Sequence, residues 1–180
     1  MIDVFLERSF KRPLETAFVM TVTLAAQGCF DLHRVAWQGS LLAKDGRRLL
    51  CHFRAPDAES ARTGLRQAGA DVTSLWPGSV HEAPGEVPTS ANVLVERTFD
   101  EPVTIERIQA IEDAGSACLQ NYRVHFVRTF FSRSGRRMIC LYRAPDAESV
   151  RLAQHQSGMP VTRVWACQRI APPGPSTTTP

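Results

Sequence analysis

Two glutamates are the first candidates for chemistry in this 180-residue chain. Glu7 and Glu96 occupy matching places in two similar segments, and each lies in a stretch that reads as a strand. Because side chains alternate between the faces of a strand, both carboxylates are expected on the face turned away from the helices. Two buried carboxylates with raised pKa values could act as general base and acid, or hold a cation. Alternatively, each is held in a structural ion pair with an arginine such as Arg54 or Arg143.

Histidines form a second set of candidates. His52 and His125 fall on expected central strands, and the matching positions in the other segment are Leu141 and Ala36. An imidazole titrates near neutral pH, so either histidine could serve as an acid or base in one copy alone. Each could equally be an edge or surface histidine.

Aromatic side chains could line a pocket for an apolar or aromatic small molecule. The residues predicted to bind such a ligand are Trp37, Phe53, Phe126 and Tyr142, together with Arg54 and Arg143. The chain has no Ser-His-Asp order, P-loop, dinucleotide fingerprint or His-Glu-x-x-His run, which removes several common enzyme classes. We predict no cofactor and no metal ligand.

A tandem duplication must position these residues. The heptapeptide RAPDAES at 54–60 recurs letter for letter at 143–149, a shift of 89 positions. The same shift relates Cys51 to Cys140 and Trp76 to Trp165 without any insertion. Two gapless copies imply one small fold made twice.

Each copy reads strand, helix, strand, strand, helix, strand. In the second copy we expect strands at 92–99, 124–131, 138–142 and 161–170, one helix after the first strand, and another that Asp146 caps and Gly158 stops. Asp57 is the matching cap in the first copy. The helix-facing side of the first strands should be wholly apolar, formed by Val4, Leu6 and Phe10 in one copy and by Val93, Val95 and Phe99 in the other.

This order predicts an α+β fold in which two tandem ferredoxin-like (β-α-β-β-α-β) units form a pseudo-dimeric α/β barrel. The predicted organisation is repeat 1 at 1–83, a linker at 84–91, repeat 2 at 92–171 and a disordered tail at 172–180. Pairing the two sheets would enclose a cavity that both copies line.

Composition and charge restrict the kinds of partner that the protein is expected to bind. The net charge of +3 is too small to indicate nucleic acid or an anionic membrane surface, and no secretory signal is visible, so we expect a cytoplasmic protein. The first-copy helix expected at 14–30 carries no charge from residue 16 onward. Such a helix could be covered by another chain, which makes homo-oligomerisation plausible.

The second copy also carries family-level motifs. The stretches LVERTF at 94–99, SRSGRR at 132–137 and CLYRAPDAES at 140–149 resemble a family of small bacterial ferredoxin-like proteins of unknown function, whose best-described member binds nickel. In that family a second-strand histidine is the obvious metal ligand. Here the matching stretches, FVRTF at 126–130 and WQGSL at 37–41, contain none, so the resemblance does not carry nickel binding onto this chain.

Three functions follow from these observations. The leading hypothesis is a small-molecule-binding or accessory protein with its ligand between two ferredoxin-like sheets. The alternative is a cofactor-independent isomerase, cyclase or lyase in which Glu7 or Glu96 transfers protons with His52 or His125. Divalent metal binding, inherited from the family alone, is the third.

Overall fold

The computed structural model describes residues 1–85 and 90–173. Within them, the chain forms eight strands and six helices. The strand pairs described below are antiparallel, as expected for the predicted α+β class. Half of the predicted linker and most of the predicted tail lie outside the described residues. In chain order the elements are β1 (Ile2–Ser9), α1 (Thr16–Ala25), α2 (Gln27–Leu32), β2 (Ala36–Ala43), β3 (Arg48–Ala55), α3 (Ala58–Gln67), β4 (Leu75–Glu82), β5 (Val93–Thr98), α4 (Ile105–Ala114), α5 (Ser116–Asn121), β6 (His125–Ser132), β7 (Arg137–Arg143), α6 (Ala147–Gln156) and β8 (Arg163–Ile170).

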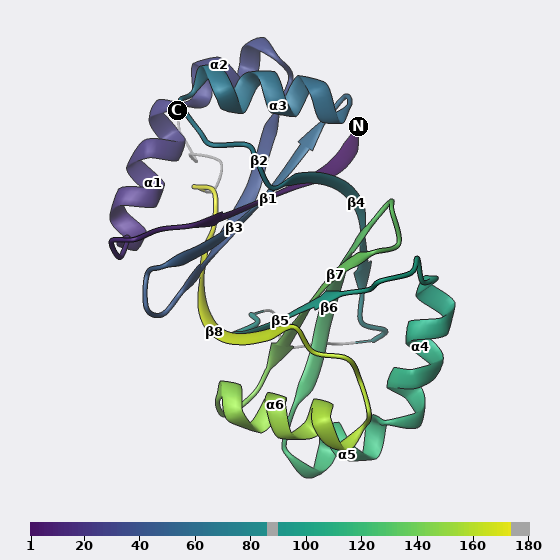
Figure 1. Cartoon of the computed structure of the whole chain (residues 1–180). Coiled ribbons are helices and arrows are strands. Elements are labelled where there is room, and N and C mark those ends of the chain that lie inside the picture. The colour runs from purple at the N-terminus through teal and green to yellow at the C-terminus, as the bar shows by residue number, and fades with distance from the viewer. Residues whose placement is uncertain (86–89, 174–180) are drawn as a thin grey trace, which may run out of the picture. The chain divides into compact units, whose positions relative to one another are not determined.

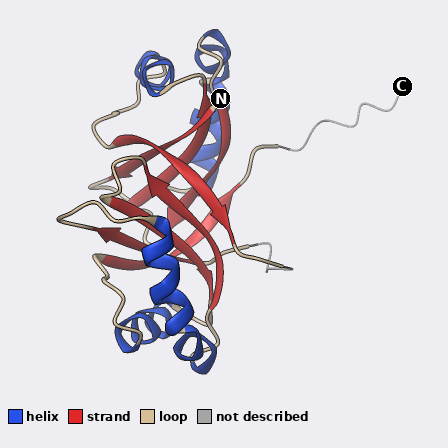
Figure 2. Ribbon diagram, turned by 90° about the vertical axis from the view of Figure 1, so that its right-hand side faces the viewer, coloured by secondary structure: helices blue, strands red, loops and turns tan. Residues whose placement is uncertain are grey.

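The chain divides into two compact units. Unit 1 comprises Met1–Leu75 with the C-terminal residues from Arg169, and unit 2 comprises Trp76–Gln168. In each unit the helices lie on one side of the strands (Figures 1 and 2). Each helix layer therefore encloses its own core against one face of its sheet.

The sheet of unit 1 has β3 between β1 and β2. Val4 and Leu6 of β1 face the helices and join a core that includes Phe30 and Phe53. Ile170, at the end of β8, belongs to the same core. Val4, Leu6 and Phe10 thus lie on the predicted side, but Arg8 of β1 shares it and lines the cavity described below, so the expectation of a wholly apolar inward face is wrong in this unit.

Unit 2 has the strand order β8-β5-β7-β6-β4. Val93 and Val95 face its helices, but so does Arg97, which lies on the same side of β5 and is completely buried. The expectation of a wholly apolar inward face is therefore wrong here. Hydrogen-bond acceptors in three other parts of the unit allow a guanidinium to take a core position.

Strand β4 shows a pairing that the repeat does not predict. It comes from the first sequence repeat, yet it pairs with β6 of the second, with Gly78 opposite Ser132 and Val80 opposite Phe130. The approach is close, because a Cβ on Gly78 would lie 2.4 Å from the carbonyl oxygen of Phe131. Unit 2 thus contains one strand more than its own repeat supplies.

The helix ends follow the sequence closely. Asp57 and Asp146 accept hydrogen bonds from the amides of Ser60 and Ser149, each at 2.7 Å, so both predicted caps are confirmed. Gly158 has a φ of +70°, as a helix-stop glycine requires.

The uncharged segment 14–30 was expected to be one helix and is instead two, α1 and α2. Ala26, with a ψ of −5°, departs from helical geometry and turns the chain between them. Phe18, Val22 and Leu24 of α1 are exposed, and Phe18 retains 57% of its surface. No helix among the described residues is long and apolar enough to cross a membrane.

Candidate functional site

A cavity of about 210 Å³ lies inside unit 1, between the helix-facing side of the sheet and the helices. Leu6 of β1 and Leu49 and Phe53 of β3 form its floor, while Val19 of α1 and Leu65 of α3 are among its walls. The uncharged α1 also contributes Phe18 and Val22 to the lining. The lining is therefore largely apolar, and part of it is reachable from solvent.

Few polar side chains reach this cavity, the most prominent being Arg8 and Cys51. The guanidinium of Arg8 lies over the ring of Phe10, 4.9 Å from its centre, and Arg8 is partly exposed. Burial raises the pKa of the Cys51 thiol to about 11, although a hydrogen bond from Ser40 and the charge of Arg8 oppose that rise. At neutral pH the site therefore offers one cation and an uncharged thiol.

The matching interior of unit 2 holds a buried arginine with its hydrogen-bond partners. A more open cavity of about 590 Å³ lies beside it at α4, α5 and the end of α6, and its lining residues Ile111 and Gly115 match Val22 and Ala26 of the unit 1 cavity. Arg97, which corresponds to Arg8, donates hydrogen bonds to the carbonyl of Pro160 at 2.7 Å, to Gln154 at 2.7 Å and to the hydroxyl of Tyr142 at 3.2 Å. Its Nε has no hydrogen-bond partner among the described residues. The guanidinium is thus anchored mainly through its two terminal nitrogens.

Glu112 completes this buried polar cluster. It accepts hydrogen bonds from the hydroxyl of Tyr142 at 3.4 Å and, more weakly, from the thiol of Cys140 at 3.8 Å. Burial raises the pKa of Glu112, and the charge of Arg97 opposes that rise. Burial likewise raises the pKa values of Cys140 and Tyr142, so both keep their protons.

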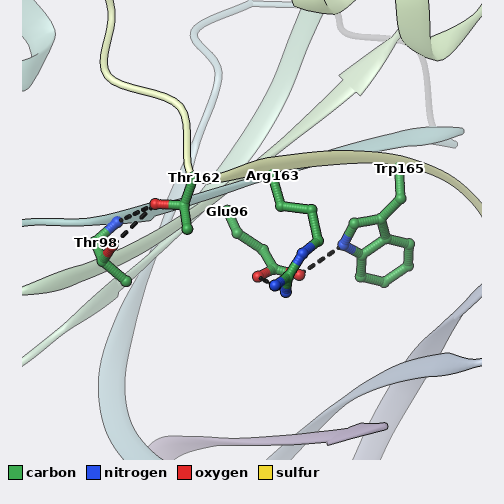
Figure 3. A network of polar contacts seen from close by, with 5 residues as sticks. All are labelled: Glu96, Thr98, Thr162, Arg163 and Trp165. Carbon is green, nitrogen blue, oxygen red and sulfur yellow. Dashed lines mark hydrogen bonds and ion pairs between the residues drawn. The ribbon is translucent and has the colours of Figure 1, made fainter. Parts of the chain in front are cut away.

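Glu96, a predicted catalytic residue, is held in a network of its own on β5 and β8. Arg163 donates to one carboxylate oxygen at 2.8 Å and the indole of Trp165 to the other at 2.7 Å (Figure 3). In the same figure the hydroxyls of Thr98 and Thr162 meet at 2.9 Å. Glu96 does form an ion pair, but its partner is Arg163 of β8 and not Arg54 or Arg143, because β8 is the strand beside β5 on this side.

Two of the other predicted catalytic residues, Glu7 and His52, lie on the same face of the unit 1 sheet, since Glu7 is opposite Leu50 and His52 is opposite Phe5. The imidazole Nε2 of His52 lies 2.7 Å from the carboxylate of Asp3 and stacks on the ring of Phe5. His125 is exposed at the start of β6. The structure thus places His52 and Glu7 on one face, two positions apart in register, and gives His52 a partner, Asp3, that the sequence did not indicate.

The predicted ligand-binding aromatics all pack on the helix-facing sides of the sheets. Trp37 and Phe53 belong to the core of unit 1, and Tyr142 to that of unit 2, with Phe126 packed edge-on against it. Of these four, Phe53 lines the cavity. The two arginines predicted beside them, Arg54 and Arg143, are exposed at strand ends.

Sequence reasoning missed Arg8 and Arg97 because an arginine on a strand is usually assigned to solvent. A signal was available in the comparison of the two copies. The positions around Arg97 carry Tyr142 and Gln154, whereas the same positions around Arg8 carry Phe53 and Leu65. Acceptors present in one copy and absent from the other mark the two arginines as different.

A nickel site does not fit the described residues. Among them, no group of three or more His, Cys, Asp or Glu side chains could hold a metal ion. Arg128, at the place of the family's histidine, is a cation paired with Glu82. No step is therefore assigned to a metal.

Comparison with known proteins gives one family and a shared fold. Residues 94–166 match the family described as nickel responsive protein SCO4226-like. SCO4226 from Streptomyces coelicolor A3(2) is 19% identical over 41% of this chain and 91% of its own, with a TM-score of 0.38. No curated protein matches the sequence.

Two chlorite dismutase structures align over nearly the whole chain. A mutant enzyme from Candidatus Nitrospira defluvii is 12% identical over 92% of this chain and 90% of its own. TA0507, named as a chlorite dismutase, is 9% identical over 94% of both chains, and each TM-score is 0.51. At these identities the likeness shows the fold alone. The resemblance predicted for the second copy is confirmed: residues 94–166 are similar to the nickel responsive SCO4226-like family.

Proposed function

We propose that the chain is a small-molecule-binding or accessory protein whose ligand occupies the apolar cavity of unit 1. The observation that carries this proposal is the difference between the repeats. The interior that Arg97 and Gln154 fill in unit 2 is a cavity of about 210 Å³ in unit 1. Well-packed proteins leave few such voids, so a largely apolar cavity beside Arg8, at the place where unit 2 has buried polar side chains, favours a binding role.

The size of the cavity restricts the ligand. An engineered cavity of about 150 Å³ lined by Leu, Ile and Phe holds benzene, so this one fits a single aromatic ring or a short branched chain. It lies below the range of about 300–1,000 Å³ that drug-sized ligands occupy. We therefore expect a ligand of one ring, bound with a dissociation constant of about 0.1–1 mM when it has no polar anchor.

Calorimetry with benzyl alcohol as a neutral probe tests this function. Ala70→Met introduces the residue found at the matching place in unit 2, Met159, and should fill the cavity and weaken binding at least 10-fold. Met138→Leu, a conservative exchange in the core of unit 2, is the control and should leave binding unchanged. Equal affinity in the wild type and in Ala70→Met would overturn the assignment.

The finer fold prediction stays a proposal. We propose two tandem ferredoxin-like units in a pseudo-dimeric α/β barrel, with repeats at 1–83 and 92–171. Each repeat has the predicted order of strands and helices, except that its first helix is divided in two, and this order and the likeness of fold to chlorite dismutases support the proposal. The ligand cavity expected between the two sheets stays a prediction, as does homo-oligomerisation through α1, which the exposure of Phe18 supports.

Proton transfer is a second candidate function, and the Asp3–His52 pair favours it. A carboxylate that holds one imidazole nitrogen at 2.7 Å fixes the orientation of the ring. With Glu7 on the same face, this arrangement suits the predicted isomerase, cyclase or lyase. Incorporation of deuterium from D₂O into enolisable acids, followed by NMR, should depend on His52. Retained exchange in His52→Gln would exclude this role.

A further inference from the structure

We infer that the ligand of the unit 1 cavity is a small carboxylic acid, with an apolar ring or short branched chain inside and its carboxylate on Arg8. This inference rests on the proposed function and adds the chemical class of the ligand. It is drawn from the two related arginines and from what surrounds each of them.

The two related arginines differ in the hydrogen-bond acceptors around them. In unit 2 the guanidinium of Arg97 is drawn inward by the hydroxyl of Tyr142 and the amide oxygen of Gln154. In unit 1 the same positions hold Phe53 and Leu65, which have no acceptor, and both line the cavity. The interior that receives a guanidinium in unit 2 therefore has no side-chain oxygen at these two positions in unit 1.

The two arginines also differ in the negative charge near them. In unit 2 the partly buried carboxylate of Glu112 lies close enough to Arg97 to interact with its charge, and the matching residue in unit 1 is Thr23. The hydroxyl of Thr23 donates to the carbonyl of Val19 within α1. The cavity of unit 1 thus has a cation at its edge, where unit 2 has a cation and an anion.

Two groups in unit 1, Asp71 and Cys51, could compete with a ligand carboxylate for Arg8. Asp71 lies near enough to be influenced by Arg8, but it is exposed, and its carboxylate accepts hydrogen bonds from the amide and hydroxyl of Thr73. Cys51, on the cavity floor, keeps its proton at neutral pH because burial raises its pKa to about 11. An incoming carboxylate therefore meets an available cation and an uncharged floor.

Arg8 also has a suitable position for capture. Its side chain lies over Phe10, which lines the same cavity, and the guanidinium presents paired donors that match a carboxylate. A ring held among Leu6, Val19 and Leu65 would place an attached carboxylate toward this edge. Charge-assisted hydrogen bonds of this kind raise affinity by about 10-fold to 100-fold.

The test compares two probes of nearly the same shape, phenylacetate and phenylacetamide, by calorimetry at low salt. We expect the wild type to bind phenylacetate at least 10-fold more tightly. Arg8→Met should lose this preference while still binding phenylacetamide, and Arg8→Lys should keep part of it. Arg66→Met, which removes an exposed arginine of α3, is the matched control and should keep all of it.

A second variant tests the same inference from the opposite direction. Phe53→Tyr combined with Leu65→Gln supplies the acceptors of unit 2, and should draw Arg8 inward and reduce phenylacetate binding at least 10-fold. Thermal unfolding of each variant establishes that it is folded.

Each contrary result has a distinct meaning. Equal affinity of the wild type for both probes, or a preference that survives in Arg8→Met, would overturn the carboxylate inference while the proposed function stands. Failure of both probes and of benzyl alcohol to bind would overturn the proposed function, and the inference with it.

Discussion

Replacement of Arg97 by methionine should destabilise the protein strongly, although the two residues have similar length. The substitution removes three hydrogen bonds, leaves the buried amide oxygen of Gln154 and the carbonyl of Pro160 without their donor, and leaves Glu112 without a nearby positive charge. Hydrogen bonds to charged groups contribute about 1.5–3 kcal/mol each, and leaving a buried acceptor without a donor adds about 1–3 kcal/mol. Because these contributions overlap, we expect a total loss of about 3–5 kcal/mol.

Equilibrium unfolding in urea, followed by tryptophan fluorescence, measures this loss. The matched control is Arg8→Met, which removes a partly exposed guanidinium over Phe10 and should cost less than about 1 kcal/mol. Both variants replace an arginine by methionine at matching positions of the two repeats. The difference between their losses of unfolding free energy therefore measures the contribution of the buried cluster around Arg97. A loss in Arg97→Met as small as that in Arg8→Met would refute the reasoning that Arg97 is a structural core residue.

Three further predictions concern pH and packing. The pKa of Glu112 is raised above its ordinary value of 4.5, so its contribution to stability is present below pH 4.5 and is lost as pH rises through the folded pKa. Urea unfolding should therefore show that Glu112→Gln gains stability relative to the wild type between pH 4 and 7. The pKa of the cap Asp146 is lowered from 3.8 by its hydrogen bonds to Ser149, so Asp146→Asn should be less stable at neutral pH. The deficit should begin to shrink as pH falls below 3.8 and should disappear as pH falls through the lower pKa of the folded state. Gly78→Ala should cost about 1–3 kcal/mol in the same assay, because its Cβ would press on the backbone of β6; an unchanged midpoint would contradict the close β4–β6 pairing.

Local signals in the sequence predicted most of the elements. The caps Asp57 and Asp146 and the stop at Gly158 depend on hydrogen bonds and backbone angles within a few residues, and all three are present in the structure. Alternation placed Val4 and Leu6 on the core face for the same reason. What depends on neighbouring residues in the chain could therefore be read directly.

Features that depend on distant partners could not be read in this way. The repeat supplied no reason for β4 to pair with β6, since that choice is made between strands of different copies. An arginine such as Arg54 or Arg143 was expected as the partner of Glu96, but the partner is Arg163, 67 positions away on β8. Arg97 was overlooked because its burial depends on acceptors from β7, α6 and the loop at Pro160.

The claim that unit 1 binds the ligand is tested most directly by a crystal structure of the protein with 4-bromobenzoate. The bromine would be located by its anomalous scattering. We predict one bromine peak inside unit 1, among Leu6, Val19 and Leu65, and the carboxylate within hydrogen-bond distance of Arg8. An empty cavity with bromine bound elsewhere in the molecule would contradict the assignment of unit 1 as the ligand-binding unit.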